Sequence, residues 1–284
     1  MKLGSFRIQG RETFGAVLDG KVIDLGLRLE GRHASLRSFL AEKNWLEVAR
    51  GIMDDTQPDF ALADATCLPV IPSGNKIFCI GVNYADHLEE TRIRKATHPT
   101  VFLRYAESQT GHLQPLLHPR ESTQFDFEGE VALVIGQGGR RIPADRAWDH
   151  IAGYACYNDG SVRDWQFHTT QWGPGKNFVS TGAFGPWMTA TDEIDPRKTP
   201  LTLTTRVNGS VVQQSNTDCL IFGIPELIRY CSTLLPLAPG DVIVTGTPGG
   251  VGMAREPQLF LKPGDQVEVE VSGVGTLVNG VQMD

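Results

Sequence analysis

The pattern of apolar and polar positions predicts mostly short strands joined by tight turns. The run QVEVEV, residues 266–271, alternates strictly, which is typical of a strand with one buried and one exposed face. Two dipeptides, Asp19-Gly20 and Asn208-Gly209, separate short β-prone runs and are typical of β-hairpin turns. The chain is therefore expected to be rich in β-structure.

Helical spacing is confined to a few places, and it is weak over residues 35–52 and clear over residues 221–236. The chain lacks the regular alternation of strands and helices that is typical of Rossmann folds and TIM barrels. Proline, glycine and serine gather in residues 68–75, where a domain boundary is expected. The sequence therefore predicts a mixed, β-rich α+β fold, with a small N-terminal α+β domain (1–72) and a catalytic domain (73–284).

Composition excludes some classes of protein. The chain has 284 residues, 40% of them hydrophobic and 21% charged, which is ordinary for a globular protein. A net charge of −7 and the lack of a long basic stripe argue against nucleic acid as a partner. No apolar stretch approaches the length of a membrane span and the N-terminus lacks a signal-peptide core, so a cytoplasmic protein is expected. The cysteines form no CxxC pair and are expected to be buried thiols: Cys67, Cys79, Cys156, Cys219 and Cys231.

Acidic residues precede an apolar run in FDFEGEVALVIG, residues 125–136. In an extended segment Glu128 and Glu130 share a face about 7 Å apart and repel each other unless a positive charge lies between them. A hard divalent cation would supply that charge, and oxygen ligands favour magnesium, manganese or calcium over zinc. The alternative is that one glutamate faces solvent at a strand edge. Asp126 shares the same face by strand parity.

Asp159 follows the apolar run IAGYACY and precedes Gly160. An aspartate at the end of a buried strand can complete a set of three oxygen ligands for a cation. It can equally close the strand with an Asx turn.

His87 and Glu90 lie three residues apart in a segment that is expected to enter a polar helix. On a helix they share a face, so that Glu90 can accept a hydrogen bond from one imidazole nitrogen and orient His87 as a general base. The alternative is a solvated salt bridge on the helix surface.

Two glycine-rich loops complete the candidates. Lys176, in GPGKNF, could reach a developing negative charge, or it could simply face solvent. The segment TGTPGGVG, residues 245–252, resembles a phosphate-binding loop only superficially, because no GK[ST] follows. It is expected to be a tight loop that offers Thr247 and backbone N–H groups to a carboxylate.

Several segments, taken together and in order, resemble the fumarylacetoacetate hydrolase family, in particular its acylpyruvate hydrolase-like and 2-hydroxyhepta-2,4-diene-1,7-dioate isomerase-like branch. They are GVNYADHLEE, DFEGEVALVIG, YNDGSVRDWQ, GKNF, RVNG and VIVTGTPGGVG, with FLKPGDQVEVEV. The resemblance covers roughly residues 75–280. It implies a β-sandwich roll, a homodimer, and a Mg²⁺ or Mn²⁺ ion, with Ca²⁺ as a substitute in crystals.

The resemblance also implies roles for single residues. It places the metal ligands at Glu128, Glu130 and Asp159. The residues that it implies for catalysis are His87, Glu90 and Lys176. The positions that match residues near a bound 2-oxo acid are Arg163, Gln166 and Thr247.

The chain departs from the family at the entry to its lid segment. Val82 stands where relatives of this branch frequently have arginine. The lid also carries Arg92, Arg94 and Lys95, which either attract a second carboxylate or form a solvated face.

The resemblance implies a hydrolase that cleaves a C–C bond in a 2,4-dioxo acid of the acylpyruvate type, giving pyruvate and a carboxylic acid. The ion would act as a Lewis acid, His87 would activate water, and Lys176 or Gln166 would stabilise the oxyanion. An isomerase or decarboxylase that acts on a related 2-oxo or dienol acid is the alternative. A non-catalytic protein that binds a metal or ligand is a more distant one.

Overall fold

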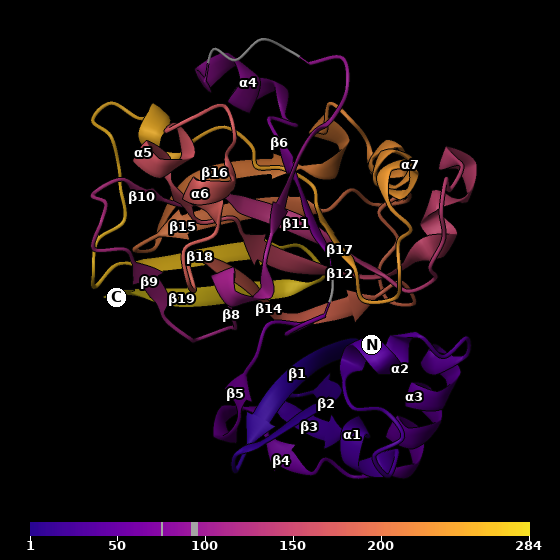
Figure 1. Cartoon of the computed structure of the whole chain (residues 1–284). Helices are drawn as coiled ribbons and strands as arrows, with labels where there is room; N and C mark the ends of the chain where they lie inside the picture. The colour runs from indigo at the N-terminus through magenta and orange to yellow at the C-terminus, as the bar shows by residue number, and fades with distance from the viewer. Residues whose placement is uncertain (75, 92–95) are drawn as a thin grey trace.

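An open twelve-stranded sheet runs through the computed structural model, which describes residues 1–74, 76–91 and 96–284 (Figure 1). In spatial order its strands are β4 (Phe60–Ala61), β3 (Lys21–Asp24), β2 (Arg11–Leu18), β1 (Lys2–Ile8), β14 (Gly182–Ala190), β12 (Ile151–Asn158), β11 (Gly129–Ile135), β17 (Val242–Val244), β6 (Ile77–Gly81) and β7 (Thr100–Arg104), with β5 (Thr66–Cys67) paired to β1 and β8 (Gln109–Thr110) paired to β14.

A five-stranded sheet packs on this large sheet. Its strands are, in spatial order, β16 (Ser210–Asn216), β15 (Thr202–Val207), β18 (Gln266–Val271), β19 (Gly275–Met283) and β9 (Leu116–His118), and a separate ribbon pairs β10 (Phe125–Asp126) with β13 (Ser161–Val162). The alternation of residues 266–271 is confirmed, because the three valines of β18 are buried while Gln266 is exposed. The valines join Val131 and Leu133 of β11 in one apolar cluster.

The helices are short. They are α1 (Leu25–Arg28), α2 (Leu36–Leu40), α3 (Trp45–Asp55), α4 (Ala85–Thr91), α5 (Arg163–Gln166), α6 (Gly173–Lys176) and α7 (Ile224–Leu234), and the 3₁₀ helices are η1 (Leu62–Asp64), η2 (Ala106–Ser108), η3 (Ala144–His150), η4 (Thr217–Cys219) and η5 (Gly252–Ala254). The predicted mixed, β-rich α+β class is therefore confirmed. No helix among the described residues is long and apolar enough to cross a membrane.

Both predicted hairpin turns form. The turn between β2 and β3 has positive φ at Asp19 (47°) and Gly20 (71°), and the turn between β15 and β16 has positive φ at Asn208 (51°) and Gly209 (77°). Positive φ at both central residues is the geometry for which Asp-Gly and Asn-Gly are suited.

The N-terminal segment forms a small body below the rest of the chain in Figure 1, with α2 and α3 against the β1–β3 strands. The helical pattern over residues 35–52 is divided between these two helices. Strand β1 pairs with β14, where Leu3 lies opposite Met188, so the large sheet continues past the predicted boundary. The division into 1–72 and 73–284 stays a prediction.

Strand β11 explains why residues 129–135 are almost wholly apolar. The strand lies between β12 and β17, and every one of its residues is buried. Val131 and Leu133 face the five-stranded sheet, while Ala132 and Val134 join the cluster that includes the N-terminal body. A strand covered on both faces has no reason to alternate.

The prediction for the cysteines was wrong at one position. Four of the five thiols are buried, but Cys219 is exposed, because η4 lies at the surface between β16 and α7.

Candidate active site

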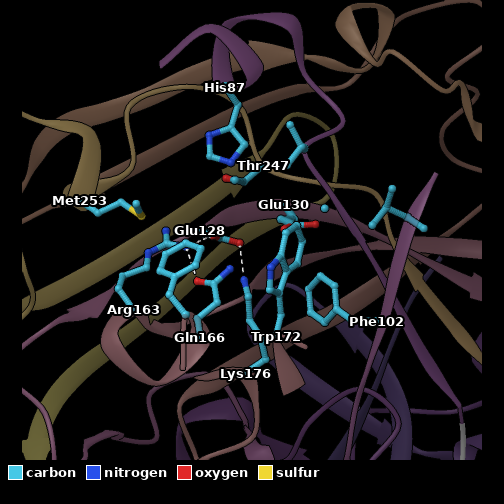
Figure 2. Close-up of a pocket in the computed structure, with 14 residues that line it drawn as sticks. His87, Phe102, Glu128, Glu130, Arg163, Gln166, Trp172, Lys176, Thr247 and Met253 are labelled. Atoms are coloured by element: carbon cyan, nitrogen blue, oxygen red, sulfur yellow. Dashed lines mark hydrogen bonds and ion pairs between the residues drawn. The ribbon is translucent and has the colours of Figure 1, made fainter. Parts of the chain in front are cut away.

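A partly open cavity of about 120 Å³ lies where β6, β11 and helices α4, α5 and α6 meet (Figure 2). One wall carries charged side chains, among them Glu128, Glu130 and Lys176. Another wall is aromatic, where the rings of Phe102 and Trp172 lie 5.7 Å apart, edge to face. This volume is far above the minimum of about 10–15 Å³ that one water needs, so the cavity has room for a small organic acid.

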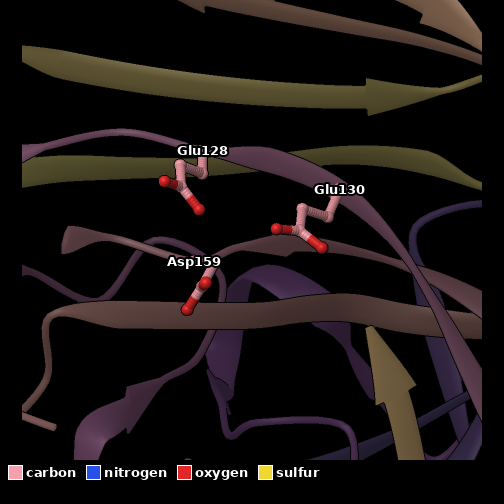
Figure 3. A group of neighbouring side chains, drawn as sticks. All are labelled: Glu128, Glu130 and Asp159. Atoms are coloured by element: carbon pink, nitrogen blue, oxygen red, sulfur yellow. The ribbon is translucent and has the colours of Figure 1, made fainter. Parts of the chain in front are cut away.

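The three predicted metal ligands come together. Each of Glu128, Glu130 and Asp159 offers an oxygen atom, and these three atoms lie within 4.8 Å of one another (Figure 3). Strand pairing produces this arrangement: Gly129 of β11 lies opposite Asn158 of β12, and the Asp159 amide donates to the Glu128 carbonyl at 2.8 Å. The three carboxyl groups are buried, so none of them faces bulk solvent.

Buried cations neutralise two of these carboxylates. Lys176 Nζ donates to Glu128 at 2.8 Å and to Asp159 at 2.7 Å, and Arg163 donates to Glu128 at 2.6 Å. Burial raises the pKa of Glu128, but the charges of Lys176 and Arg163 lower it by more, so that it lies well below its ordinary value. Lys176 is only 1% exposed and ends α6, so it is neither a solvent-facing lysine nor part of an open loop.

Glu130 differs from its neighbours, because among the described residues no side-chain cation is bonded to it. The backbone N–H of Gly246 donates to its Oε2 at 2.5 Å. Burial, together with the charges of Asp159 and Glu128, raises the pKa of Glu130 well above its ordinary value.

The charges fit a cation at this place. Four buried carboxylates (Asp126, Glu128, Glu130, Asp159) face three buried cations (Arg104, Arg163, Lys176), which leaves one negative charge over. An all-oxygen set with surplus negative charge suits a hard divalent ion. The residues that would hold such an ion are Glu128, Glu130 and Asp159.

Arg104 is a site residue that the sequence did not indicate. It ends β7, is 2% exposed, and donates to Asp159 at 2.5 Å and to the Gly160 carbonyl at 2.9 Å. An arginine at the end of an apolar strand looks like a surface charge, and its partner is 55 positions away. Only the three-dimensional structure shows that its guanidinium contacts one of the three carboxylates.

We expect Arg104→Leu to lower the free energy of unfolding by about 3–5 kcal/mol, because it leaves the buried carboxylate of Asp159 with less positive charge beside it. The matched control is Arg206→Leu, which removes an ion pair of 2.7 Å to Glu270 at the surface and should cost below about 1 kcal/mol. Urea unfolding without divalent ions measures both. Equal losses in the two variants would contradict this assignment for Arg104.

His87 and Glu90 form the predicted pair on α4. His87 Nδ1 lies 2.8 Å from Glu90 Oε1, and the imidazole points into the cavity, near Thr247 (Figure 2). Since a carboxylate only accepts, we assign the proton of the ring to Nδ1. The His87 side chain is only 7% exposed, so the pair is not a solvated surface salt bridge.

The loop over residues 245–253 binds carboxylates, but they are the chain's own. Its backbone N–H groups donate to Glu130 from Gly246, to Glu90 from Gly250, and to Asp126 from Gly252 and Met253, at 2.5–2.9 Å. The loop was expected to offer N–H groups to a carboxylate, and these four groups donate to carboxylates of the chain itself.

The other predicted substrate-binding residues also lie at the cavity. The Thr247 hydroxyl donates to the Gly129 carbonyl at 2.9 Å and accepts from Gln213 at 2.8 Å, so it is engaged within the fold. Gln166 is buried and accepts a hydrogen bond from Arg163 at 2.9 Å. The Nη2 atom of Arg163 is buried and has no hydrogen-bond partner among the residues that the structure describes.

Val82, where the chain departs from the resembled family, lines the cavity with φ at +53°. A β-branched residue rarely adopts positive φ, so the backbone is strained where β6 turns into the segment before α4. Arg92, Arg94 and Lys95 lie outside the described residues.

A buried cavity with convergent charged groups and an oriented imidazole is typical of enzymes that act on small acids. The chain belongs to the fumarylacetoacetate hydrolase family. The family model described as fumarylacetoacetate (FAA) hydrolase C-terminal matches residues 76–282, and the predicted family membership is confirmed.

Known proteins of several activities are similar to the chain. The oxaloacetate tautomerase Fahd2a, mitochondrial, of Rattus norvegicus is 36% identical over 267 residues, which is 93% of this chain and 85% of that protein. The solved fumarylacetoacetate hydrolase of Exiguobacterium antarcticum is 30% identical, with a TM-score of 0.82 and full coverage of both chains. Maleylpyruvate hydrolase of Sphingobium.sp SYK-6 is 26% identical, also with a TM-score of 0.82 and full coverage of both.

Proposed function

We propose that the chain catalyses proton transfer at C3 of a small 2-oxo acid, interconverting its enol and keto forms, and that oxaloacetate is a substrate. The observation that carries this proposal is the His87–Glu90 pair, which faces the same cavity as the buried carboxylates. The relatives named oxaloacetate tautomerase support it, since they are similar over most of the chain.

Each group has a chemical task in this reaction. Arg163 Nη2 binds a carboxylate of the substrate, because it is a buried donor without another partner in the described part of the chain. Glu90 holds Nδ1 of His87, so that Nε2 is the ring atom that takes a proton from C3 or returns one. A divalent cation, held by Glu128, Glu130 and Asp159, would supply positive charge that stabilises an enolate. The apolar side chains that line the cavity, among them Phe102 and Trp172, limit the access of water to the carbanion-like carbon.

Proton transfer makes smaller demands on the site than hydrolysis does. C–C hydrolysis also needs a bound water and a donor for the oxyanion at C4. Lys176, the expected donor, already donates to Glu128 and Asp159, and its ammonium lies 5.0 Å above the Phe102 ring. Gln166 would be left for that task. Tautomerisation therefore ranks first and hydrolysis second.

The proposal predicts faster decay of the enol of oxaloacetate, followed by its ultraviolet absorbance, when the protein and Mg²⁺ are added. Pyruvate and carbon dioxide are assayed in the same mixture. Loss of absorbance without pyruvate supports a tautomerase, whereas pyruvate with carbon dioxide indicates a decarboxylase. If the protein leaves the rate of enol decay at the uncatalysed value with oxaloacetate and with other 2-oxo acids, the proposal is contradicted.

Hydrolysis of an acylpyruvate is the second candidate. The His87–Glu90 pair can activate a water as well as a carbon acid, and the similarity to maleylpyruvate hydrolase favours this chemistry. A panel of acylpyruvates assayed for pyruvate separates the two candidates, because a tautomerase leaves C3–C4 intact.

The remaining predictions are part of the proposal. They are a homodimer, no nucleic-acid or membrane partner, and a cytoplasmic location, although the similar proteins named oxaloacetate tautomerase are also named mitochondrial.

A further inference from the structure

Asp126 is a buried carboxylate that belongs neither to the candidate metal ligands nor to the His87–Glu90 pair. It is fully buried in β10, and four donors surround it. Oδ1 accepts from the backbone N–H groups of Phe127 and Gly252, both at 2.8 Å, and Oδ2 accepts from Arg163 Nε at 2.8 Å and from the Met253 N–H at 2.9 Å.

These contacts fix the orientation of the Arg163 guanidinium. Nε is held by Asp126, while Nη1 donates to Glu128 at 2.6 Å and to Gln166 at 2.9 Å. A planar group held through two of its three nitrogens cannot rotate, so the direction of Nη2 is set. Figure 2 shows this guanidinium at the cavity, between Met253 and Glu128.

We propose that Asp126 is a positioning residue: it aims Arg163 Nη2 at a carboxylate of the 2-oxo acid substrate. This inference rests on the proposed function, and it adds a residue whose side chain acts only through Arg163 and the loop at Gly252 and Met253. Three backbone N–H groups also donate to Asp126, so the carboxylate is itself held in place and can fix the arginine that donates to it.

Two other roles for Asp126 predict different effects of Asp126→Asn on substrate binding. If its charge acted directly on the substrate, Asp126→Asn would tighten the binding of an anion, because a negative charge is removed. If it only supported the fold, the variant would be less stable but would bind the substrate as before. A positioning role predicts weaker binding that depends on the presence of Arg163.

The test is a double-mutant cycle with Asp126→Asn, Arg163→Lys and the double variant. Pyruvate, a simple 2-oxo acid, is titrated calorimetrically in Mg²⁺ buffer, and KM and kcat are measured with oxaloacetate. We expect Asp126→Asn to weaken pyruvate binding and raise KM about ten- to hundredfold, as for a lost hydrogen bond between charged groups, with a smaller change in kcat. In the double variant the two effects should not add.

Asp241→Asn is the matched control. Asp241 is also fully buried, accepts hydrogen bonds from two backbone N–H groups and forms an ion pair with a lysine. It lies just before β17, whereas the loop that contacts Asp126 follows β17. It should lose stability without weakening pyruvate binding. Unchanged or tighter binding in Asp126→Asn, or additive effects in the double variant, would overturn the proposal.

Should Asp126→Asn fail to fold, Arg163→Lys alone decides, because it keeps the charge but removes Nη2; full affinity in that variant would also overturn it. Pyruvate binding is measured without turnover, so these outcomes stay separate from failure of the proposed reaction.

Discussion

Glu130→Gln is expected to stabilise the protein without divalent ions and to abolish its stabilisation by Mg²⁺ or Mn²⁺. In the ion-free protein Glu130 is a buried carboxylate that accepts a hydrogen bond from one backbone N–H and lies next to two other carboxylates. An amide keeps the hydrogen bond to Gly246 and can donate to Asp159 or Glu128 instead of repelling them. We expect a gain of about 1–3 kcal/mol in the free energy of unfolding, the size of one relieved buried polar group.

Glu128→Gln is the matched variant, and its effect should have the opposite sign. Glu128 is paired with Lys176 and Arg163, so the substitution leaves buried cations with less compensation. A loss of about 3–5 kcal/mol is expected without ions. The two glutamates are two positions apart, are both buried and undergo the same substitution. A difference between the two changes in the free energy of unfolding therefore reports on their different partners.

The pH dependence of the two effects follows from their pKa shifts. The folded pKa of Glu130 is raised above its ordinary value of 4.5, so its destabilising effect is absent at low pH and grows as pH rises above about 4.5. The folded pKa of Glu128 is lowered, so its stabilising effect is present above about 4.5 and is lost as pH falls. The gain from Glu130→Gln should therefore disappear in acid.

Urea unfolding in chelator and with added ions measures these effects. The parent should gain about 2.7 kcal/mol when the ion is at a hundredfold excess over its Kd, and Glu130→Gln should gain nothing. An equal gain in both proteins would show that Glu130 is not a metal ligand. No gain in the parent would contradict the metal site itself.

The parts of this site that depend on short-range spacing could be predicted from the sequence. Glu128 and Glu130 share a face because of strand periodicity, and His87 and Glu90 meet because of helix periodicity, so both pairs follow from spacing alone. The same holds for the hairpin turns and for the alternation of β18.

Contacts between distant segments could not be read in this way. Arg104 ends β7 and donates to Asp159, which follows β12, although three strands lie between β12 and β7 in the sheet. The glycine loop showed that N–H groups would be available, but its acceptors, Glu90, Glu130 and Asp126, are more than a hundred positions away. Local sequence indicates a donor and not its partner.

His87→Gln is expected to lower kcat for oxaloacetate enol decay by about 10²–10⁴-fold, the usual contribution of a general acid–base group. Stabilisation by Mg²⁺ should be retained, because His87 is not among the proposed metal ligands. The control is His33→Gln: His33 Nε2 lies 2.6 Å from Glu42 in the N-terminal body, so it forms the same kind of pair away from the cavity. A kcat within twofold of the parent in His87→Gln would exclude this residue as the acid–base group.

Glu90→Gln separates orientation from proton transfer. Glu90 accepts from His87 through Oε1 and from the Gly250 N–H through Oε2. Glutamine has one acceptor oxygen, so it can keep only one of these bonds. If the oxygen keeps the bond from Gly250, the amide NH2 faces Nδ1 and favours the tautomer with the proton on Nε2, which can no longer take a proton from C3; if it keeps the bond from His87, the loop loses its hydrogen bond to α4. Either outcome should lower kcat by less than His87→Gln does, because the imidazole itself remains, and the double variant should be no slower than His87→Gln alone.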